Sequence, residues 1–151
     1  MSTAGTGPPP QPGPALLHRF LGIGLVILAV AMVIARHAGG IEAAPETTLL
    51  PAYITSGVSF LMCAAALMFL KPLVPRRGAG KPIAAYWADP SVAPKALRVW
   101  FILEGAGVMA SVSYFLGGGM IAAALIVLSV AVYWLNGPRV FAEDEPQARL
   151  P

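Results

Sequence analysis

Glu104 is the residue whose type and position most clearly suggest chemistry. It lies in the segment VWFILEGAGVMASVSYF, residues 99–115, and is the only formally charged side chain in that segment. An ionisable side chain inside an apolar membrane segment often marks a pathway for protons or cations. Such a group also serves as a shielded, hydrogen-bonded contact that fixes helix packing or docks a partner subunit. A transporter normally needs several such groups, and the apolar stretches of this chain hold no second one, so we favour packing or docking.

Three further residues extend the site along one helical face. Side chains three or four positions apart stack on a helix, so Glu104 aligns with Gly107, Ser111 and Tyr114. Small residues four apart, as at Gly107 and Ser111, let membrane helices approach each other closely. We therefore expect Glu104 to face protein rather than lipid.

The next apolar stretch is expected to supply the neighbours of Glu104. Residues 117–119 are three glycines, which tolerate backbone angles that other residues resist, and they predict a tight hairpin. Folding about this turn places Glu104 opposite Ser129 and Tyr133, which lie one helical turn apart. Their hydroxyls are expected to donate hydrogen bonds to the carboxylate.

The histidines and the cysteine do not predict a catalytic or metal site. His18 and His37 would stand about 28 Å apart along one helix, so they cannot bind the same metal ion. We interpret both as boundary residues in contact with lipid headgroups, although one histidine could also hold a chlorophyll magnesium. Cys63 is alone, which excludes an intramolecular disulfide. No phosphate-binding loop, zinc-protease signature or serine nucleophile elbow is present.

The composition predicts an all-α, polytopic integral membrane protein. Of the 151 residues, 57% are hydrophobic and only 11% are charged, whereas soluble domains are about 25% charged. The charged residues avoid four apolar stretches, each close to the roughly 17–25 residues that cross a bilayer. We predict a transmembrane domain over residues 16–138, with helices at about 16–36, 49–71, 96–116 and 119–136.

The distribution of lysine and arginine predicts the orientation. The connection over residues 71–98 holds six of them, the N-terminal tail one and the C-terminal tail two, against one in residues 36–48. By the positive-inside rule, both termini and the second connection are cytoplasmic. We thus predict a multi-pass protein of a bacterial cytoplasmic (inner) membrane. Its net charge of +3 reflects this orientation and does not predict nucleic-acid binding.

The segments outside the helices have distinct compositions. Residues 1–15 contain five prolines and are expected to form a disordered cytoplasmic tail. Residues 139–151 are expected to form a second cytoplasmic tail. In PIAAYWADP, residues 82–90, Tyr86 and Trp87 are aromatics of the kind that favour the headgroup level, so we predict that they are interfacial anchors.

The second half of the chain carries a resemblance. KALRVWFILEGAGVMASVSYFLGGG, followed by an apolar helix that ends in YWLNGPRVF, resembles a loose group of uncharacterised four-helix bacterial membrane proteins. The resemblance covers residues 95–141 and rests on the Leu103-Glu104-Gly105 step and on the ending Pro138-Arg139. It implies a four-helix architecture and no established activity.

These features together favour a non-catalytic role. We expect a small accessory or scaffold subunit packed against other membrane protein subunits, with a respiratory or photosynthetic complex as a reasonable host. The alternative is a small oligomeric carrier or channel that uses Glu104 to bind a proton or cation. A membrane enzyme acting on lipid is disfavoured by the missing catalytic pairs. No cofactor is predicted, and the apolar helices leave room for a bound lipid or pigment.

Overall fold

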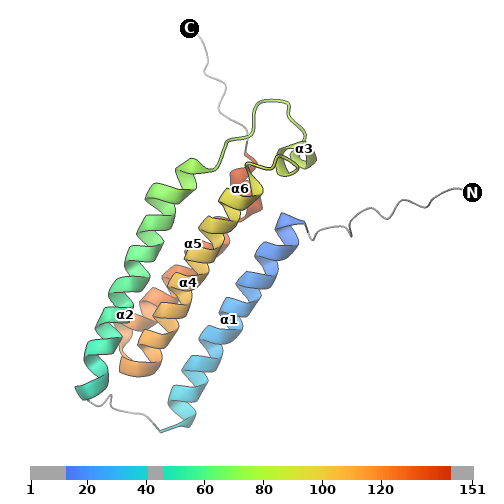
Figure 1. Cartoon of the computed structure of the whole chain (residues 1–151). Coiled ribbons are helices and arrows are strands. Elements are labelled where there is room, and N and C mark those ends of the chain that lie inside the picture. The colour runs from blue at the N-terminus through green and yellow to red at the C-terminus, as the bar shows by residue number, and fades with distance from the viewer. Residues whose placement is uncertain (1–12, 41–45, 144–151) are drawn as a thin grey trace, which may run out of the picture.

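The computed structural model describes residues 13–40 and 46–143, and the regular elements in these ranges are all helical (Figure 1). The predicted all-α class is confirmed. In chain order the elements are α1 (Pro14–Ala38), α2 (Glu46–Ala65), the π-helical turn η1 (Ala66–Leu70), the 3-10 turn η2 (Lys71–Leu73), α3 (Ile83–Trp87), α4 (Ala93–Gly117), α5 (Met120–Leu135) and α6 (Pro138–Phe141).

Three of these helices are long and apolar enough to cross a membrane. They are α1, α2 together with its continuation to Leu73, and α4. The fourth apolar helix, α5, has 16 residues. At 1.5 Å per residue it is about 24 Å long, shorter than the roughly 30 Å of bilayer hydrocarbon. The lengths and compositions of the three long helices support the prediction of a membrane protein.

The folded unit extends beyond the predicted domain limits at both ends. Helix α1 begins at Pro14, inside the predicted N-terminal tail, and residues 1–12 lie outside the described residues. Helix α6 and the buried Phe141 and Ala142 fall inside the predicted C-terminal tail, of which residues 144–151 are not described. Residues of this predicted tail pack on the end of the bundle, where the rings of Phe141 and Trp100 have centroids 5.9 Å apart.

Helix α4 is the central element, and α1, α2 and α5 pack around it (Figure 1). Within a bilayer, apolar burial does not distinguish a neighbouring helix from lipid, so close backbone approach and van der Waals contact hold helices together. The buried face of α4 suits this kind of packing because most of its residues are small: Ala96, Ala106, Gly107, Ala110, Ser111 and Ser113.

Helix α2 runs antiparallel to α4 along a seam of small and polar contacts. A Cβ built on Gly105 would lie 2.6 Å from Met62, and one built on Gly117 would lie 2.6 Å from Ala52, so α4 is in close contact with α2 near both ends of α2. Ser113 Oγ of α4 donates to the carbonyl oxygen of Ala52 at 2.7 Å. Direct contact between these two helices leaves no space for a side chain at either glycine.

Pro72 explains why α2 ends in irregular turns. Proline has no N–H to donate and its ring clashes with the carbonyl four residues earlier, which breaks the regular ladder. The Lys71 N–H consequently donates to the Ala66 carbonyl, five residues earlier, in the π-helical turn η1. The 3-10 turn η2 follows. Met68 and Phe69 of η1 lie on the outside of the bundle, where both are exposed.

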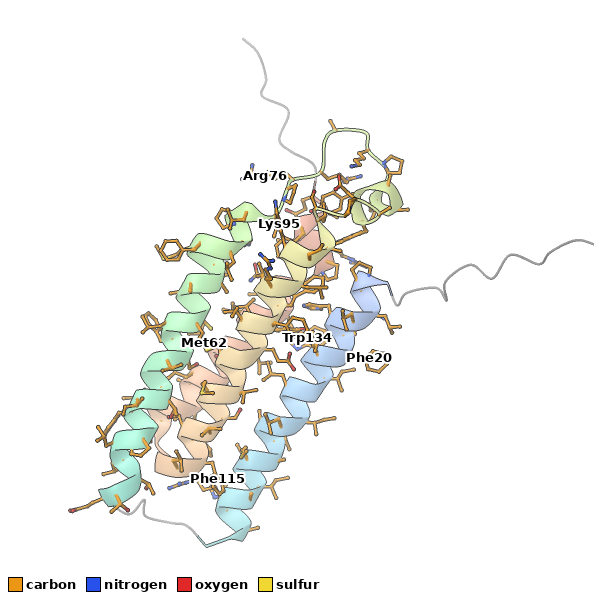
Figure 2. The ribbon with its side chains drawn as sticks, viewed as in Figure 1. Phe20, Met62, Arg76, Lys95, Phe115 and Trp134 are labelled. Atoms are coloured by element: carbon orange, nitrogen blue, oxygen red, sulfur yellow. The ribbon has the colours of Figure 1, made fainter. Side chains whose placement is uncertain are left out.

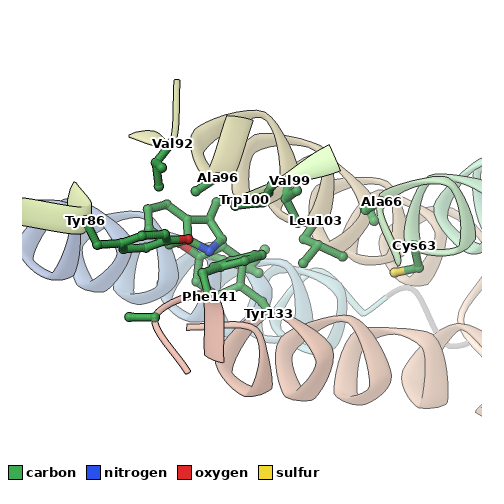
Figure 3. Close-up of a cluster of buried hydrophobic side chains, with 14 residues drawn as sticks. Cys63, Ala66, Tyr86, Val92, Ala96, Val99, Trp100, Leu103, Tyr133 and Phe141 are labelled. Atoms are coloured by element: carbon green, nitrogen blue, oxygen red, sulfur yellow. The ribbon is translucent and has the colours of Figure 1, made fainter. Parts of the chain in front are cut away.

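Aromatic residues gather at one end of the bundle. There the rings of Tyr86, Trp100, Tyr133 and Phe141 pack together beside Val92 (Figure 3). The outward faces of α1, α2 and α5 carry large exposed apolar side chains, and Phe20 points away from the bundle (Figure 2). Such outward faces are expected of helices that lipid or another membrane protein covers.

Candidate functional site: the face of α4 around Glu104

Glu104 lies at the edge of the buried face of α4. Its side chain is half-buried, one turn beyond the fully buried Trp100. No hydrogen bond joins its carboxyl group to another residue of the ranges that the structure describes. It lies within electrostatic range of Tyr133 of α5. The chain therefore shields this carboxyl group in part and leaves its oxygens without a donor from the described residues.

The predicted stripe along α4 faces α1. A Cβ on Gly107 would lie 2.6 Å from Leu25 Cδ1, so this glycine admits the leucine side chain into the helix interface. The Tyr114 hydroxyl and the His37 Nε2 are 3.2 Å apart. Ser111 is buried and donates to the Gly107 carbonyl oxygen of its own helix at 2.8 Å. We expected α5 as the neighbour of this face, but the contacts of Gly107 and Tyr114 are with α1.

Ser129 and Tyr133 are buried on α5, yet the structure does not pair them with Glu104. The Tyr133 hydroxyl donates to the main-chain oxygen of His18 at 2.8 Å. Ser129 Oγ lies 3.8 Å from Cys63 Sγ on α2. The expected hydrogen bonds to the carboxylate are therefore not formed. The prediction matched residues by depth alone, and depth does not fix the direction in which a side chain leaves its helix.

His18 is a core residue rather than a headgroup contact. It is 3% exposed and its ring stacks on Tyr133 with centroids 4.5 Å apart, while Trp100 approaches its edge at 5.0 Å. Its Nε2 lies 3.2 Å from the Tyr133 carbonyl oxygen, which favours the tautomer protonated at Nε2. The boundary interpretation is wrong, because α1 brings its first turns against α4 and α5.

The sequence did carry a signal for this packing. The buried residues of α1 recur at positions 18, 22, 25, 29 and 36, which is the spacing of one helical face. Rings of Tyr133 and Trp134 lie within 3 Å of a Cβ built on Gly22, so this face contacts α5 directly. His18 and Arg36 both lie on this face of α1, so the three- and four-residue spacing of small and polar residues predicts that both point inward.

Arg36 and Thr48 bind the end of α4. The last carbonyls of a helix have no partner within the helix. Arg36 is buried, and its Nη1 donates to the Phe115 carbonyl oxygen at 2.7 Å. Thr48 Oγ1 donates to the Leu116 carbonyl oxygen at 3.1 Å. In the sequence, Arg36 is only one cation of the first connection, and its contact with α4 was not predicted.

The two predicted interfacial anchors lie in different environments. Tyr86 is buried, and its hydroxyl donates to the Pro75 carbonyl oxygen at 2.7 Å. Burial raises the pKa of its phenol, and the nearby Asp89 carboxylate raises it further. Trp87 is half-buried and packs edge-on against Tyr86 with centroids 5.1 Å apart. Tyr86 is therefore an internal support of the connection between η2 and α4, and the prediction of a headgroup contact is wrong for it.

The described residues form no metal centre. Within residues 13–40 and 46–143, no three His, Cys, Asp or Glu side chains come together as ligands. Cys63 is buried and carries a free thiol. The chain matches no protein-family model, no curated protein and no solved structure.

Proposed function

We propose that this chain is a small, non-catalytic accessory subunit of a larger protein complex in a bacterial inner membrane. The observation that carries the proposal is the state of Glu104, which is half-buried on α4 and lacks a hydrogen-bond donor from the described residues. An acidic side chain near the centre of a membrane helix costs about 2.5–3.5 kcal/mol on insertion scales. A partner subunit that supplies a donor at this position would remove that cost.

The proposed topology has four membrane crossings, with both ends in the cytoplasm. Helices α1, α2 and α4 have sufficient length, and α5 is apolar throughout its 16 residues. Gly118 and Gly119 adopt φ values of 64° and 84° between α4 and α5, which supports a tight hairpin at the far side of the bilayer. The short α5 is accommodated by local thinning of the bilayer or by a partner that covers its end.

The exposed apolar surface supports a role in assembly. Phe101 of α4, three residues before Glu104, is 53% exposed. Large apolar residues also remain uncovered along α1, including Ile23, Ile27 and Ile34. Lipid covers such residues adequately, but it offers no hydrogen-bond donor to a carboxyl group in the hydrocarbon region. The combination of an apolar surface and an unpaired acid therefore favours a protein partner over lipid alone.

A comparison of extracted complexes tests the proposal. Membranes are solubilised in mild detergent and analysed on native gels for the wild type, Glu104→Leu and the matched variant Glu46→Leu, which alters an exposed acid at the start of α2. We expect a partner of fixed stoichiometry with the wild type and Glu46→Leu, and its loss with Glu104→Leu. A partner retained equally by all three contradicts docking through Glu104.

The alternative function is a small oligomeric carrier that binds a proton or cation at Glu104. The same unpaired carboxyl group favours it, because a carrier needs an accessible ligand. Proton flux into proteoliposomes separates the two functions. A homo-oligomer whose flux is abolished by Glu104→Gln, while its assembly stays intact, establishes the carrier and excludes the accessory subunit.

A further inference from the structure

A second site lies between the turns that follow α2 and the end of α6. A cavity of about 640 Å³ opens there between the turns that follow α2 and the start of the C-terminal segment. Lys71, Arg76 and Glu143 supply its charged lining, and Leu67, Val140 and Phe141 supply much of its apolar lining. The candidate membrane helix that contains α2 ends at Leu73. The cavity is thus located where hydrocarbon gives way to headgroups.

The cations of the cavity are available to a ligand. Lys71 is half-buried and Arg76 is exposed, and neither forms an ion pair or hydrogen bond within the described ranges. Glu143, also exposed, reduces the formal charge of the lining to +1. A lining of this charge complements a phosphodiester, which carries one negative charge. A soluble anion alone would leave the apolar part of the lining uncovered.

The wall of the cavity is held in place by the neighbouring Arg77. Its Nε donates to the Ala142 carbonyl oxygen at 2.7 Å, and its Nη1 donates to the Lys81 carbonyl oxygen at 2.7 Å. The bond to Ala142 ties the connection after α2 to the segment after α6, and the bond to Lys81 braces that connection internally. Because the two sides are joined, the cavity is preformed and a ligand does not have to order it, which lowers the cost of binding.

We propose that this cavity binds the headgroup of an anionic phospholipid. Its phosphate contacts Lys71 and Arg76, and an acyl chain runs along Leu67 into the hydrocarbon. Basic pockets between membrane helices on the cytoplasmic side commonly bind phospholipid headgroups. The inference rests on the proposed placement of α2 in the membrane, and not on a partner subunit.

Native mass spectrometry of the full chain in detergent tests this site. Phosphatidylglycerol is titrated against phosphatidylcholine of the same acyl composition. The cavity variant Lys71→Gln/Arg76→Gln is compared with Lys95→Gln/Arg98→Gln, which removes the same two charge types from exposed positions of α4 outside the cavity. We expect phosphatidylglycerol to bind about fivefold more weakly for each cavity cation removed, because one cation near the surface contributes about 1 kcal/mol. The α4 variant should bind as the wild type does.

Two further arms keep the test decisive. Glu143→Gln removes the acid of the cavity and is expected to strengthen phosphatidylglycerol binding. This variant still tests the site if the double cavity variant does not fold. Glycerol 3-phosphate, which lacks acyl chains, is expected not to displace the lipid. The proposal is overturned if the two lipids bind equally well, or if both double variants lose the same affinity for phosphatidylglycerol. It is also overturned if Glu143→Gln does not raise that affinity, or if glycerol 3-phosphate displaces the lipid. Loss of a partner on native gels is a separate readout and leaves lipid binding unaffected.

Discussion

The Arg36 guanidinium of α1 donates a hydrogen bond from Nη1 to the Phe115 carbonyl oxygen of α4, 2.7 Å away. The contact joins the last turn of one long helix to the last turns of another that runs parallel to it (Figure 1). A cation at this position also interacts favourably with the negative end of the α4 dipole. One side chain thus satisfies an orphan carbonyl and fixes the register of α1 on α4.

Replacement of Arg36 by methionine is expected to destabilise the bundle by about 1.5–3 kcal/mol, the usual contribution of a hydrogen bond that involves a charged group. Thermal unfolding in detergent, followed by circular dichroism, measures the change. Arg19→Met is the matched control, because Arg19 is exposed on the same helix. Equal effects of the two substitutions would show that the contact with Phe115 does not stabilise the fold.

The hydrogen bond between the Tyr133 hydroxyl and the His18 carbonyl oxygen gives a second prediction. Tyr133→Phe removes a buried donor and leaves that oxygen with fewer partners. We therefore expect the free energy of unfolding to fall by about 1 kcal/mol. Tyr53→Phe, at a position that is 67% exposed on α2, should leave stability unchanged. The midpoints of thermal unfolding of the two variants are compared directly.

The interface between α1 and α4 depends on the absence of a side chain at Gly107. A valine there overlaps Leu25, whose Cδ1 would lie 2.6 Å from the new Cβ. We expect Gly107→Val to cost about 1–3 kcal/mol, which is typical of overpacking. Gly24→Val is the control, because a Cβ on Gly24 meets nothing within 4 Å. The idea fails if chemical unfolding in mixed micelles gives the two variants the same stability.

Alkaline pH is expected to loosen the connection between η2 and α4. The pKa of Tyr86 is raised by burial and by the Asp89 carboxylate, so its phenol is held neutral. Above about pH 10, the ordinary value for tyrosine, the unfolded chain loses this proton before the folded chain does. The stabilisation is therefore fully present below pH 10 and is lost as the pH rises through the higher folded value.

Hydrogen exchange of residues 83–92 against pH measures this effect. Protection should fall above pH 10 in the wild type. In Tyr86→Phe, which has no phenol to ionise, protection should begin lower, because the bond to the Pro75 carbonyl oxygen is missing. The protection of this variant should then show no further fall as the pH rises above 10. A pH step of the same size in the variant contradicts the role of Tyr86.

Much of the fold could be predicted from composition and apolar length. The four apolar helices lie close to their predicted ranges, because a run of apolar residues about 20 long admits few structures other than a helix. The predicted range 49–71 stopped short of the helix start at Glu46. The π-helical turn η1 was not predicted either. The effect of Pro72 on the preceding turn depends on which donors satisfy the carbonyls that the proline leaves free, and the sequence does not show this.

The site was less predictable, because the sequence gives depth along a helix more readily than direction around it. Glu104, Gly107 and Ser111 do share one side of α4, as their spacing indicates. Which helix covers that side is decided by packing across the whole bundle. The contact of Gly107 with Leu25 assigns it to α1, although the shortest connection in the chain leads to α5. His18 was misjudged for the same reason, since proximity to a helix end does not reveal burial.

Photo-cross-linking in intact membranes, from positions beside Glu104, would show whether a partner subunit covers this carboxyl group. A photoreactive residue at 101 or 108, one turn to either side of Glu104, is compared with one at 60, on α2, where Phe60 is 59% exposed. If Glu104 docks a partner subunit, we expect a single protein adduct of fixed mass from position 101 or 108. Glu104→Leu should abolish that adduct, and position 60 should give lipid adducts alone. Lipid adducts at all three positions, or an adduct with a second copy of this chain, would contradict docking of a partner subunit through Glu104.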